Sequence, residues 1–204
     1  MIAGLVLAAG ESSRMGQDKA LLTYQGKTFL EQILVTLREA GIDRTVVVLG
    51  HHADEIQRAV NLKGAHVVIN RDYRRGQTSS LQAGLAVLVE PPLEAIILCL
   101  VDHPAVSAGT IRKLVNGFRA SQAPVMIPTF KGRHGHPVLV ARRLFAELLA
   151  LAPDQGANTV IRKYRNATQF VDVDDRGILL DVDDPETYRR LGEASDPGAP
   201  PSSR

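Results

Sequence analysis

Short hydrophobic runs recur along the chain and alternate with segments in which apolar residues return at every third or fourth position. The uninterrupted runs predict buried strands, because a strand covered on both faces has no polar side. Strands are therefore expected at 2–8, 45–49, 65–69, 95–101, 125–127, 137–140, 170–173 and 178–182.

The segments between these runs have the spacing of helices with one buried face. Thr28 and Glu31 fit a capping box, and Gly41 is a typical residue for the end of the helix that they begin. The other helices are expected at 53–60, from Ser79 or Ser80 to Pro91-Pro92, from Ser107 to Phe118, at 144–151, at 158–164 and from Asp184-Pro185 onward.

Strands that alternate with helices predict a three-layer αβα sandwich around a Rossmann-like, mostly parallel (mixed) sheet. No linker divides residues 1–192, so we expect one domain, and the polar, Pro-rich stretch 193–204 is expected to be a disordered tail. In such folds ligands bind where the strands end, which directs attention to residues 8–19, 50–52, Asn70 and 102–104.

Composition narrows the class of protein further. The 204 residues carry a net charge of +2, and their basic side chains are scattered apart from Arg71, Arg74 and Arg75, so nucleic-acid binding is not indicated. The single cysteine, Cys99, lies in an apolar strand and is expected to be a buried thiol. The apolar N-terminus has no basic leader and no segment is long enough to span a membrane, so a cytoplasmic protein is expected.

The loop after the first strand carries the strongest chemical signal. Gly10 and Gly16 allow a ligand close to the backbone, and Arg14 and Lys19 could neutralise phosphates. The spacing is neither that of a Walker A loop nor G-x-G-x-x-G, which counts against a Rossmann-type dinucleotide oxidoreductase. The alternative is a glycine-bearing connection with solvated charges, but the position at the end of a strand favours a ligand site.

This loop reads Leu-Ala-Ala-Gly-x-Ser-x-Arg-Met-Gly-x-x-Lys from Leu7 to Lys19, and it resembles the signature of the molybdenum cofactor nucleotidyltransferases. The resemblance continues through 70–81, Val101-Asp102-His103-Pro104, 135–139 and 181–186, to about residue 190, and is strongest with the cytidylyltransferase branch. It implies the nucleotidyltransferase (GT-A-like) fold and a Mg²⁺ cofactor.

The resemblance also implies residue roles. The implied residues are, for the nucleotide, Leu7, Ala8, Ala9, Gly10, Ser13, Arg14, Lys19, Asn70, Ser79 and Ser80; for catalysis, Arg14, Lys19 and Asp102; for the metal, Asp102 and Asp183; and for the acceptor, His103, His136 and Asp183. Asp183 is expected to be either a second metal ligand or a group that orients substrate. His103 could contact substrate or fill the loop, and His136 could contact substrate or make a structural hydrogen bond.

The implied reaction is transfer of CMP from CTP to a phosphorylated acceptor, the molybdopterin form of the molybdenum cofactor, with a molybdoenzyme as the receiver of the product. Ala9 carries a methyl group where GTP-using relatives have glycine, which favours a pyrimidine. The alternatives are the same chemistry with GTP or a sugar or polyol phosphate, and a non-catalytic nucleotide-binding chaperone. Asn158 stands where the branch often has arginine, which leaves the acceptor open.

Two further groups have less specific patterns. His51 and His52 follow a strand and are interpreted as the start of a helix rather than as direct participants. Arg71, Arg74 and Arg75 form either a solvated basic loop or a contact for a phosphorylated second substrate.

Overall fold

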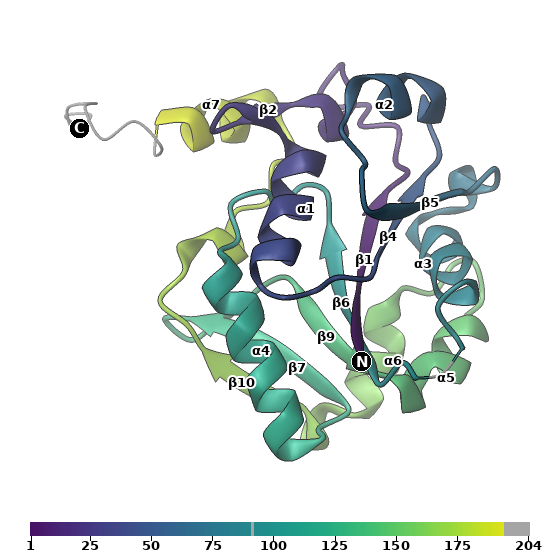
Figure 1. Ribbon diagram of the computed structural model, residues 1–204, viewed down its shortest axis with the longest axis vertical. Coiled ribbons are helices and arrows are strands. Elements are labelled where there is room, and N and C mark those ends of the chain that lie inside the picture. Colours follow the sequence, from purple (N-terminus) through teal and green to yellow (C-terminus); the bar gives the residue numbers. More distant parts are fainter. Residues whose placement is uncertain (91, 194–204) are drawn as a thin grey trace.

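The computed structural model describes residues 1–90 and 92–193, in which strands and helices alternate as predicted (Figure 1). The main sheet has eight strands in the order β10-β7-β9-β6-β1-β4-β5, with β8 paired to β7. All neighbours are parallel except that β9 runs antiparallel to β6 and β7, and β8 antiparallel to β7. The strands are β1 (Ile2–Ala8), β4 (Thr45–Leu49), β5 (Ala65–Ile69), β6 (Ala95–Leu100), β7 (Val125–Phe130), β8 (Arg133–His134), β9 (Val138–Ala141) and β10 (Gln169–Asp172).

Helices cover both faces of this sheet, so the predicted three-layer sandwich is confirmed (Figure 1). One face packs against α1 (Phe29–Glu39), α2 (Ala53–Ala59) and α4 (Ala108–Ser121). The other packs against α3 (Gln77–Ala86), α5 (Phe145–Leu149) and α6 (Ala157–Lys163). The last helix, α7 (Pro185–Glu193), lies beside a hairpin of β2 (Thr23–Tyr24) and β3 (Lys27–Thr28), and short 3-10 helices lie at 19–21, 73–75, 142–144, 165–167 and 176–179.

Strand β1 lies between β4 and β6, and all its residues are buried. Its side chains alternate between two hydrophobic clusters: Val6 and Ala8 belong to the cluster with α1 and α4, whereas Leu5 and Leu7 belong to the cluster with α3. Burying each large apolar side chain stabilises the fold by about 1.5–3 kcal/mol. Cys99 on β6 is also buried, as predicted, and burial raises the pKa of its thiol to about 12.

Helix α3 approaches the sheet closely at Gly84, where a Cβ atom would lie 2.4 Å from Leu5 Cδ1 and 2.8 Å from Val48 Cγ2. We expect Gly84→Ala to lower the free energy of unfolding by about 1–2 kcal/mol, since overpacking costs about 1–3 kcal/mol and alanine returns up to about 1 kcal/mol of helix propensity. Urea denaturation measures the change. The matched control is Gly192→Ala in α7, where a Cβ would meet no atom within 4 Å; equal stabilities of the two variants would contradict the close packing.

The predicted start of the helix before Pro91 is wrong. Helix α3 begins after Gly76, whose φ of 100° is open to glycine but strained for other residues, rather than at Ser79 or Ser80. The Ser79 hydroxyl contacts the Gly76 carbonyl oxygen at 2.8 Å, so it bonds back along the chain instead of capping. The helix ends at Ala86, before Pro91, which lies outside the described residues.

The strand expected at 178–182 is also wrong. This segment begins with a 3-10 helix, Arg176–Leu179, because the Asp175 carboxylate accepts the Gly177 backbone N–H at 2.9 Å and fixes a turn there. The apolar residues are buried without strand pairing: Ile178 and Val182 are both fully buried. Asp184 caps α7 by accepting the Thr187 backbone N–H at 2.8 Å, as its place before Pro185 predicts.

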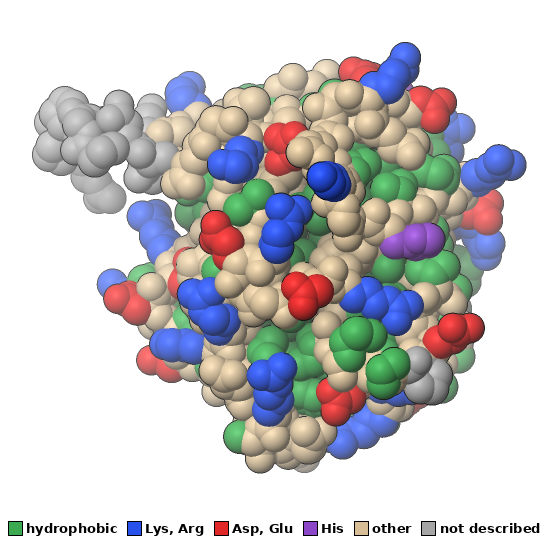
Figure 2. Space-filling model, viewed as in Figure 1, with side chains coloured by type: hydrophobic (Ala, Val, Ile, Leu, Met, Phe, Trp, Pro, Cys, Tyr) green, Lys and Arg blue, Asp and Glu red, His purple; other side chains and the backbone are tan. Residues whose placement is uncertain are grey.

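The surface carries both signs of charge. On the face drawn in Figure 2, Lys and Arg side chains are interspersed with Asp and Glu side chains. Among the described residues, no helix is both long and apolar enough to cross a bilayer. The predicted disordered tail at 193–204 lies, apart from Glu193 at the end of α7, outside the described residues.

Candidate active site

The parallel strands bring distant loops together at one edge of the sheet. Ala8 at the end of β1 is in register with Leu49 on β4, and Leu7 with Leu100 on β6. The segments that follow these strands also bond to one another: the His51 N–H donates to the Ala9 carbonyl oxygen at 3.2 Å. The edge selected from sequence is thus one continuous surface.

A pocket of about 260 Å³ opens at this edge. Its position agrees with the rule that open α/β sheets bind ligands beyond the carboxyl ends of their strands. Seven of the predicted site residues line it: Leu7, Ala8, Ala9, Gly10, Lys19, Ser80 and Asp102. The other lining residues are Ser12, Asp18, Ala20, Tyr73, Gly76, Gln77, Leu100 and Val101.

Lys19 joins two of the predicted carboxylates. Its ammonium group donates to Asp102 Oδ2 at 3.2 Å and also to Asp183 Oδ1. Burial alone would lower the pKa of Lys19, but the hydrogen bond to Asp183 and the charge of Asp102 raise it above its usual value. The hydrogen bond from Lys19 lowers the pKa of Asp183 in turn. The site therefore holds a lysine cation between two carboxylates at the pocket wall.

The carboxylates also offer free oxygen atoms. Asp102 Oδ1 is buried and has no hydrogen-bond partner within 1–90 and 92–193, although His103 Nε2 lies 3.8 Å away. Oxygen atoms of Asp102, Asp181 and Asp183 lie within 4.8 Å of one another. An unpaired buried carboxylate oxygen is costly unless a cation or water completes it. An all-oxygen set of carboxylates is the donor set that Mg²⁺ and Mn²⁺ prefer, so these residues fit such an ion.

Asn70 supports the opposite wall of the pocket. Its side-chain amide donates to Ser79 Oγ at 2.9 Å and to Ser80 Oγ at 3.0 Å, so the first turn of α3 is tied to the end of β5. Asn70 is itself buried and does not line the pocket, whereas Ser80 does. The structure therefore brings these three predicted residues together and gives Asn70 a supporting position.

Two of the first-loop residues that were predicted to bind the nucleotide do not line the pocket. Ser13 and Arg14 are exposed, and the guanidinium of Arg14 lies 3.8 Å from Asp183 Oδ2 with 78% of its side chain exposed. Ser12 lies inside instead, and its hydroxyl accepts the Lys19 backbone N–H at 3.0 Å. Sequence alone could not distinguish the two serines, because they are adjacent and the loop is irregular.

His103 and His136 form a pair behind Asp102. Their ring centroids are 4.9 Å apart, and both Nδ1 atoms are buried without a hydrogen-bond partner in the described part of the chain. Burial lowers the pKa of both, that of His136 to about 4 with a contribution from His103, so both rings are neutral near pH 7. The residue before His136 is glycine, and a side chain would not fit there, because a Cβ at Gly135 would lie 2.2 Å from the Ile178 carbonyl oxygen.

A second pocket, of about 430 Å³, adjoins the first through Gln77 and Leu100. It contains His136 and also Asn158, the residue that departs from the family pattern. Its other lining residues are Leu98, Ile127, His134, Gly135, Val138, Gly156, Ala157 and Ile161. The mostly apolar wall with a few polar groups is typical of a site for an organic ligand.

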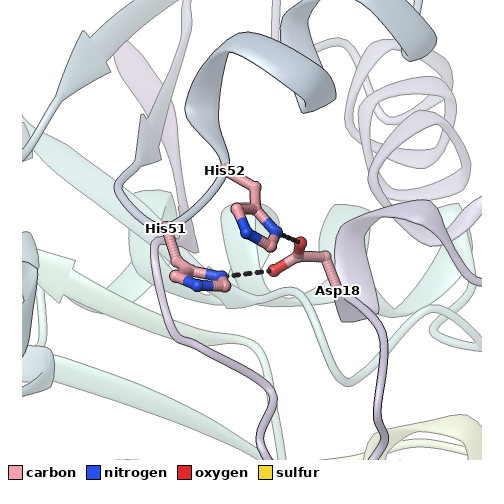
Figure 3. Close-up of side chains that lie close together, drawn as sticks. All are labelled: Asp18, His51 and His52. Atoms are coloured by element: carbon pink, nitrogen blue, oxygen red, sulfur yellow. Dashed lines mark hydrogen bonds and ion pairs between the residues drawn. The ribbon is translucent and has the colours of Figure 1, made fainter.

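Sequence reasoning missed one cluster at this edge. His51 and His52 do begin α2, with His52 as its N-cap, but both side chains turn to the Asp18 carboxylate (Figure 3). The sequence signal that could have found this cluster was the position of the two histidines directly after β4, at the edge where the pocket lies.

Of the three arginines Arg71, Arg74 and Arg75, Arg74 pairs with Glu11 at 3.1 Å, and both residues lie at the surface.

Comparison with known proteins identifies the family. A model of the MobA-like NTP transferase domain matches residues 4–168. Nicotine blue oxidoreductase of Paenarthrobacter nicotinovorans is 31% identical over 93% of this chain and 96% of its own length. Molybdenum cofactor cytidylyltransferase of Escherichia coli is 25% identical over 90% of this chain and 92% of its own length. The chain belongs to the MobA-like NTP transferase family, as the signature loop indicates.

Solved structures agree with this assignment. The Mycobacterium tuberculosis protein Rv0371c is 36% identical, covers 94% of this chain and 97% of its own, and superposes with a TM-score of 0.84. A structure of Rv0371c in complex with manganese has a TM-score of 0.79 at 34% identity, covering 95% of this chain and 98% of its own. The prediction of a nucleotidyltransferase of this family is thus confirmed as a class, and a relative binds manganese.

Proposed function

We propose that this protein transfers CMP from CTP to a phosphorylated acceptor in the presence of Mg²⁺ and releases pyrophosphate. The observation that carries the proposal is Lys19, which contacts Asp102 and Asp183 at the wall of a pocket formed by residues 7–10. This places a cation and two carboxylates beside a small-residue loop. Such an arrangement suits a triphosphate and its metal ion.

In this reaction a phosphate oxygen of the acceptor attacks the α-phosphorus of the nucleotide. A new P–O bond forms, the bond from the α-phosphorus to the bridging oxygen breaks, and pyrophosphate leaves with the electron pair. The protein needs no nucleophile of its own, so its task is to position the two substrates and to stabilise negative charge. Lys19 and Arg14 would supply positive charge to the triphosphate.

Asp102 and Asp183 would hold the Mg²⁺ ion, which supplies charge neutralisation at the phosphate oxygens when bound. Lys19 contacts the same two carboxylates and also lines the pocket, so its ammonium group lies where it could contact phosphate. Residues Leu7, Ala8, Ala9 and Gly10 would contact the base and ribose, and Ser80, held by Asn70, would fix the nucleotide.

The acceptor would occupy the second pocket. His136 and Asn158 are polar groups in the wall of this pocket, and His136, which is neutral and lies beside His103, can donate or accept a hydrogen bond. The resemblance to the E. coli cytidylyltransferase favours the molybdopterin form of the molybdenum cofactor as the acceptor, and hence a molybdoenzyme as the receiver. Ala9 lines the pocket and stands where GTP-using relatives have glycine, which supports a pyrimidine as the base.

Pyrophosphate release tests the proposal. With Mg²⁺ and molybdenum cofactor we expect release from CTP and at least about tenfold less from GTP, because a purine would meet the Ala9 methyl group and a loss of about 1.4 kcal/mol is tenfold in rate. A coupled phosphate assay measures it, with each nucleotide alone as a control for hydrolysis. Faster release from GTP would reverse the nucleotide assignment, and no release with any nucleotide would leave a non-catalytic nucleotide-binding chaperone.

The similarity to nicotine blue oxidoreductase of P. nicotinovorans supports a second candidate, an oxidoreductase that acts on an organic compound. The mostly apolar second pocket would suit such a ligand. The first loop lacks G-x-G-x-x-G, which weighs against a Rossmann-type nicotinamide site. Oxidation of NADH or NADPH in the presence of a heterocyclic acceptor, without pyrophosphate release, would favour this candidate over nucleotidyl transfer.

A further inference from the structure

A group of nitrogen and oxygen ligand atoms lies beside the nucleotide pocket and has no part in the proposed transfer. Asp18, His51 and His52 each place one such atom within 4.8 Å of the other two. His52 Nδ1 lies 2.7 Å from Asp18 Oδ2, and His51 Nδ1 lies 3.3 Å from Asp18 Oδ1. Figure 3 shows both rings turned toward the two oxygens of one carboxylate.

The backbone holds the two histidines in this position. His52 has a φ of 47°, in the left-handed region that residues with a side chain rarely adopt. The turn before it is fixed against the first loop, because His51 N–H bonds to the Ala9 carbonyl oxygen and a Cβ at Gly50 would lie 2.8 Å from that same oxygen. The tertiary contacts therefore maintain a locally unfavourable conformation that places both imidazoles on Asp18.

The carboxylate of this cluster is buried, and the two imidazole rings are packed closely together. The Asp18 side chain is only 6% exposed, and the two rings that cover it have centroids 3.7 Å apart. Two imidazole nitrogens and the oxygens of a buried carboxylate therefore converge in one place. A divalent transition-metal ion binds imidazole nitrogen and carboxylate oxygen together, so the geometry of the cluster is that of a set of metal ligands.

We propose that Asp18, His51 and His52 form a binding site for a divalent transition-metal ion of the Zn²⁺ type, distinct from the Mg²⁺ site. Two nitrogen donors and one carboxylate suit zinc and its neighbours, whereas Asp102 and Asp183 offer oxygen alone, which suits magnesium. Three protein ligands leave a coordination position for water. The side chains of His51 and His52 are 24% and 54% exposed, so an ion can enter from solvent.

The bound ion would tie the first loop to the turn between β4 and α2. Asp18 directly precedes Lys19, and both line the pocket, so the ion would fix the base of the segment that carries the lysine. Apart from this position, the proposal is independent of the transferase reaction. Its test measures metal binding in the absence of nucleotide and acceptor. The metal-site proposal can therefore fail while the transferase proposal succeeds, and the transferase proposal can fail while the metal-site proposal succeeds.

The experiment uses the full chain, freed of metal with a chelator and dialysed against Zn²⁺ or Co²⁺ in a large excess of Mg²⁺. We expect one equivalent of Zn²⁺ per chain and a Co²⁺ absorption spectrum with the intensity of a four- or five-coordinate site containing nitrogen. Both should persist in the double variant Asp102→Asn/Asp183→Asn. Loss of groups that only orient a metal ligand already weakens binding by about 10–100-fold, so His51→Gln/His52→Gln should weaken it by about 100-fold or more.

Two variants separate a metal site from a structural hydrogen-bond cluster. Asp18→Asn keeps the size and hydrogen-bonding capacity of the side chain but removes its charge, so it should remain folded by circular dichroism and lose the Zn²⁺ equivalent. His66→Gln, on exposed β5, is the matched histidine control and should bind as wild type does. The proposal is overturned if the chain binds no Zn²⁺ or Co²⁺ in excess Mg²⁺, or if folded Asp18→Asn or His51→Gln/His52→Gln binds as tightly as His66→Gln.

Discussion

The Asp102→Asn variant is expected to remain folded and to lose about 10³-fold in kcat for pyrophosphate release, which corresponds to about 4 kcal/mol of transition-state stabilisation. The physical reason is Asp102 Oδ1, a buried oxygen that has no hydrogen-bond partner among the described residues and that a metal ion would complete. The amide removes the charge but keeps the shape. Steady-state kinetics at saturating Mg²⁺ and nucleotide measure the loss.

The matched control is Asp184→Asn, which lies in the same acidic segment as Asp183 but caps α7 through the Thr187 backbone N–H. Asparagine is an equally good N-cap, so this variant should keep the activity and the stability of the wild type. Mn²⁺ binding, followed by electron paramagnetic resonance, should weaken in Asp102→Asn and not in Asp184→Asn. Wild-type turnover by a folded Asp102→Asn would remove this aspartate from the mechanism.

Replacement of Lys19 by methionine is expected to lower kcat/KM by about 10²-fold, within the 2–4 kcal/mol typical of a group that stabilises transition-state charge. Methionine keeps an unbranched side chain of similar length, so packing is little changed. The side chain of Lys19 is only 12% exposed and its pKa is raised, so it is a cation throughout the neutral pH range. The exposed Lys27 on β3 supplies the control variant Lys27→Met, for which no change is expected.

Metal binding distinguishes Lys19 from Asp102. Lys19 contacts Asp102 and Asp183, the two carboxylates that would hold the metal ion, so Lys19→Met, which removes this cation, should bind Mn²⁺ at least as tightly as the wild type while its kcat/KM falls. Asp102→Asn should lose both metal affinity and turnover. If Lys19→Met lost Mn²⁺ binding together with activity, the lysine would serve to hold the carboxylates in place and not to neutralise phosphate.

The sequence pattern predicted an element correctly where a single physical signal determined the conformation of that segment. Strand β1 and helix α1 follow from an uninterrupted apolar run and a capping box, and the structure contains both. The pattern failed where a local hydrogen bond competed with it. The apolar residues near Ile178 resemble a strand, but Asp175 fixes a turn. Ser79 resembles a cap, but its hydroxyl bonds back to the carbonyl oxygens of Gly76 and Asp72.

The first loop was predicted as a ligand site, but its internal arrangement was not. Ser12 and Ser13 are adjacent and chemically identical, yet only Ser12 lines the pocket. Arg14 and Lys19 are both basic, but Arg14 is largely exposed whereas Lys19 is largely buried between two carboxylates. These differences depend on loop backbone geometry, which has no repeat that a sequence can reveal.

The sequence by itself determined the αβα fold, the edge of the sheet at which the candidate site lies and the family, because periodicity, strand ends and a signature of fixed spacing are properties of one continuous segment at a time. Only the tertiary structure decided which charges meet. Asp183 reaches Lys19 across 164 positions and His52 reaches Asp18 across 34. The parallel register of β1 and β4 brings His52 to Asp18, and the bond from the Val182 N–H to the Asp102 carbonyl oxygen brings Asp183 to the end of β6. No local pattern encodes these pairings, because each joins segments that are far apart in the sequence.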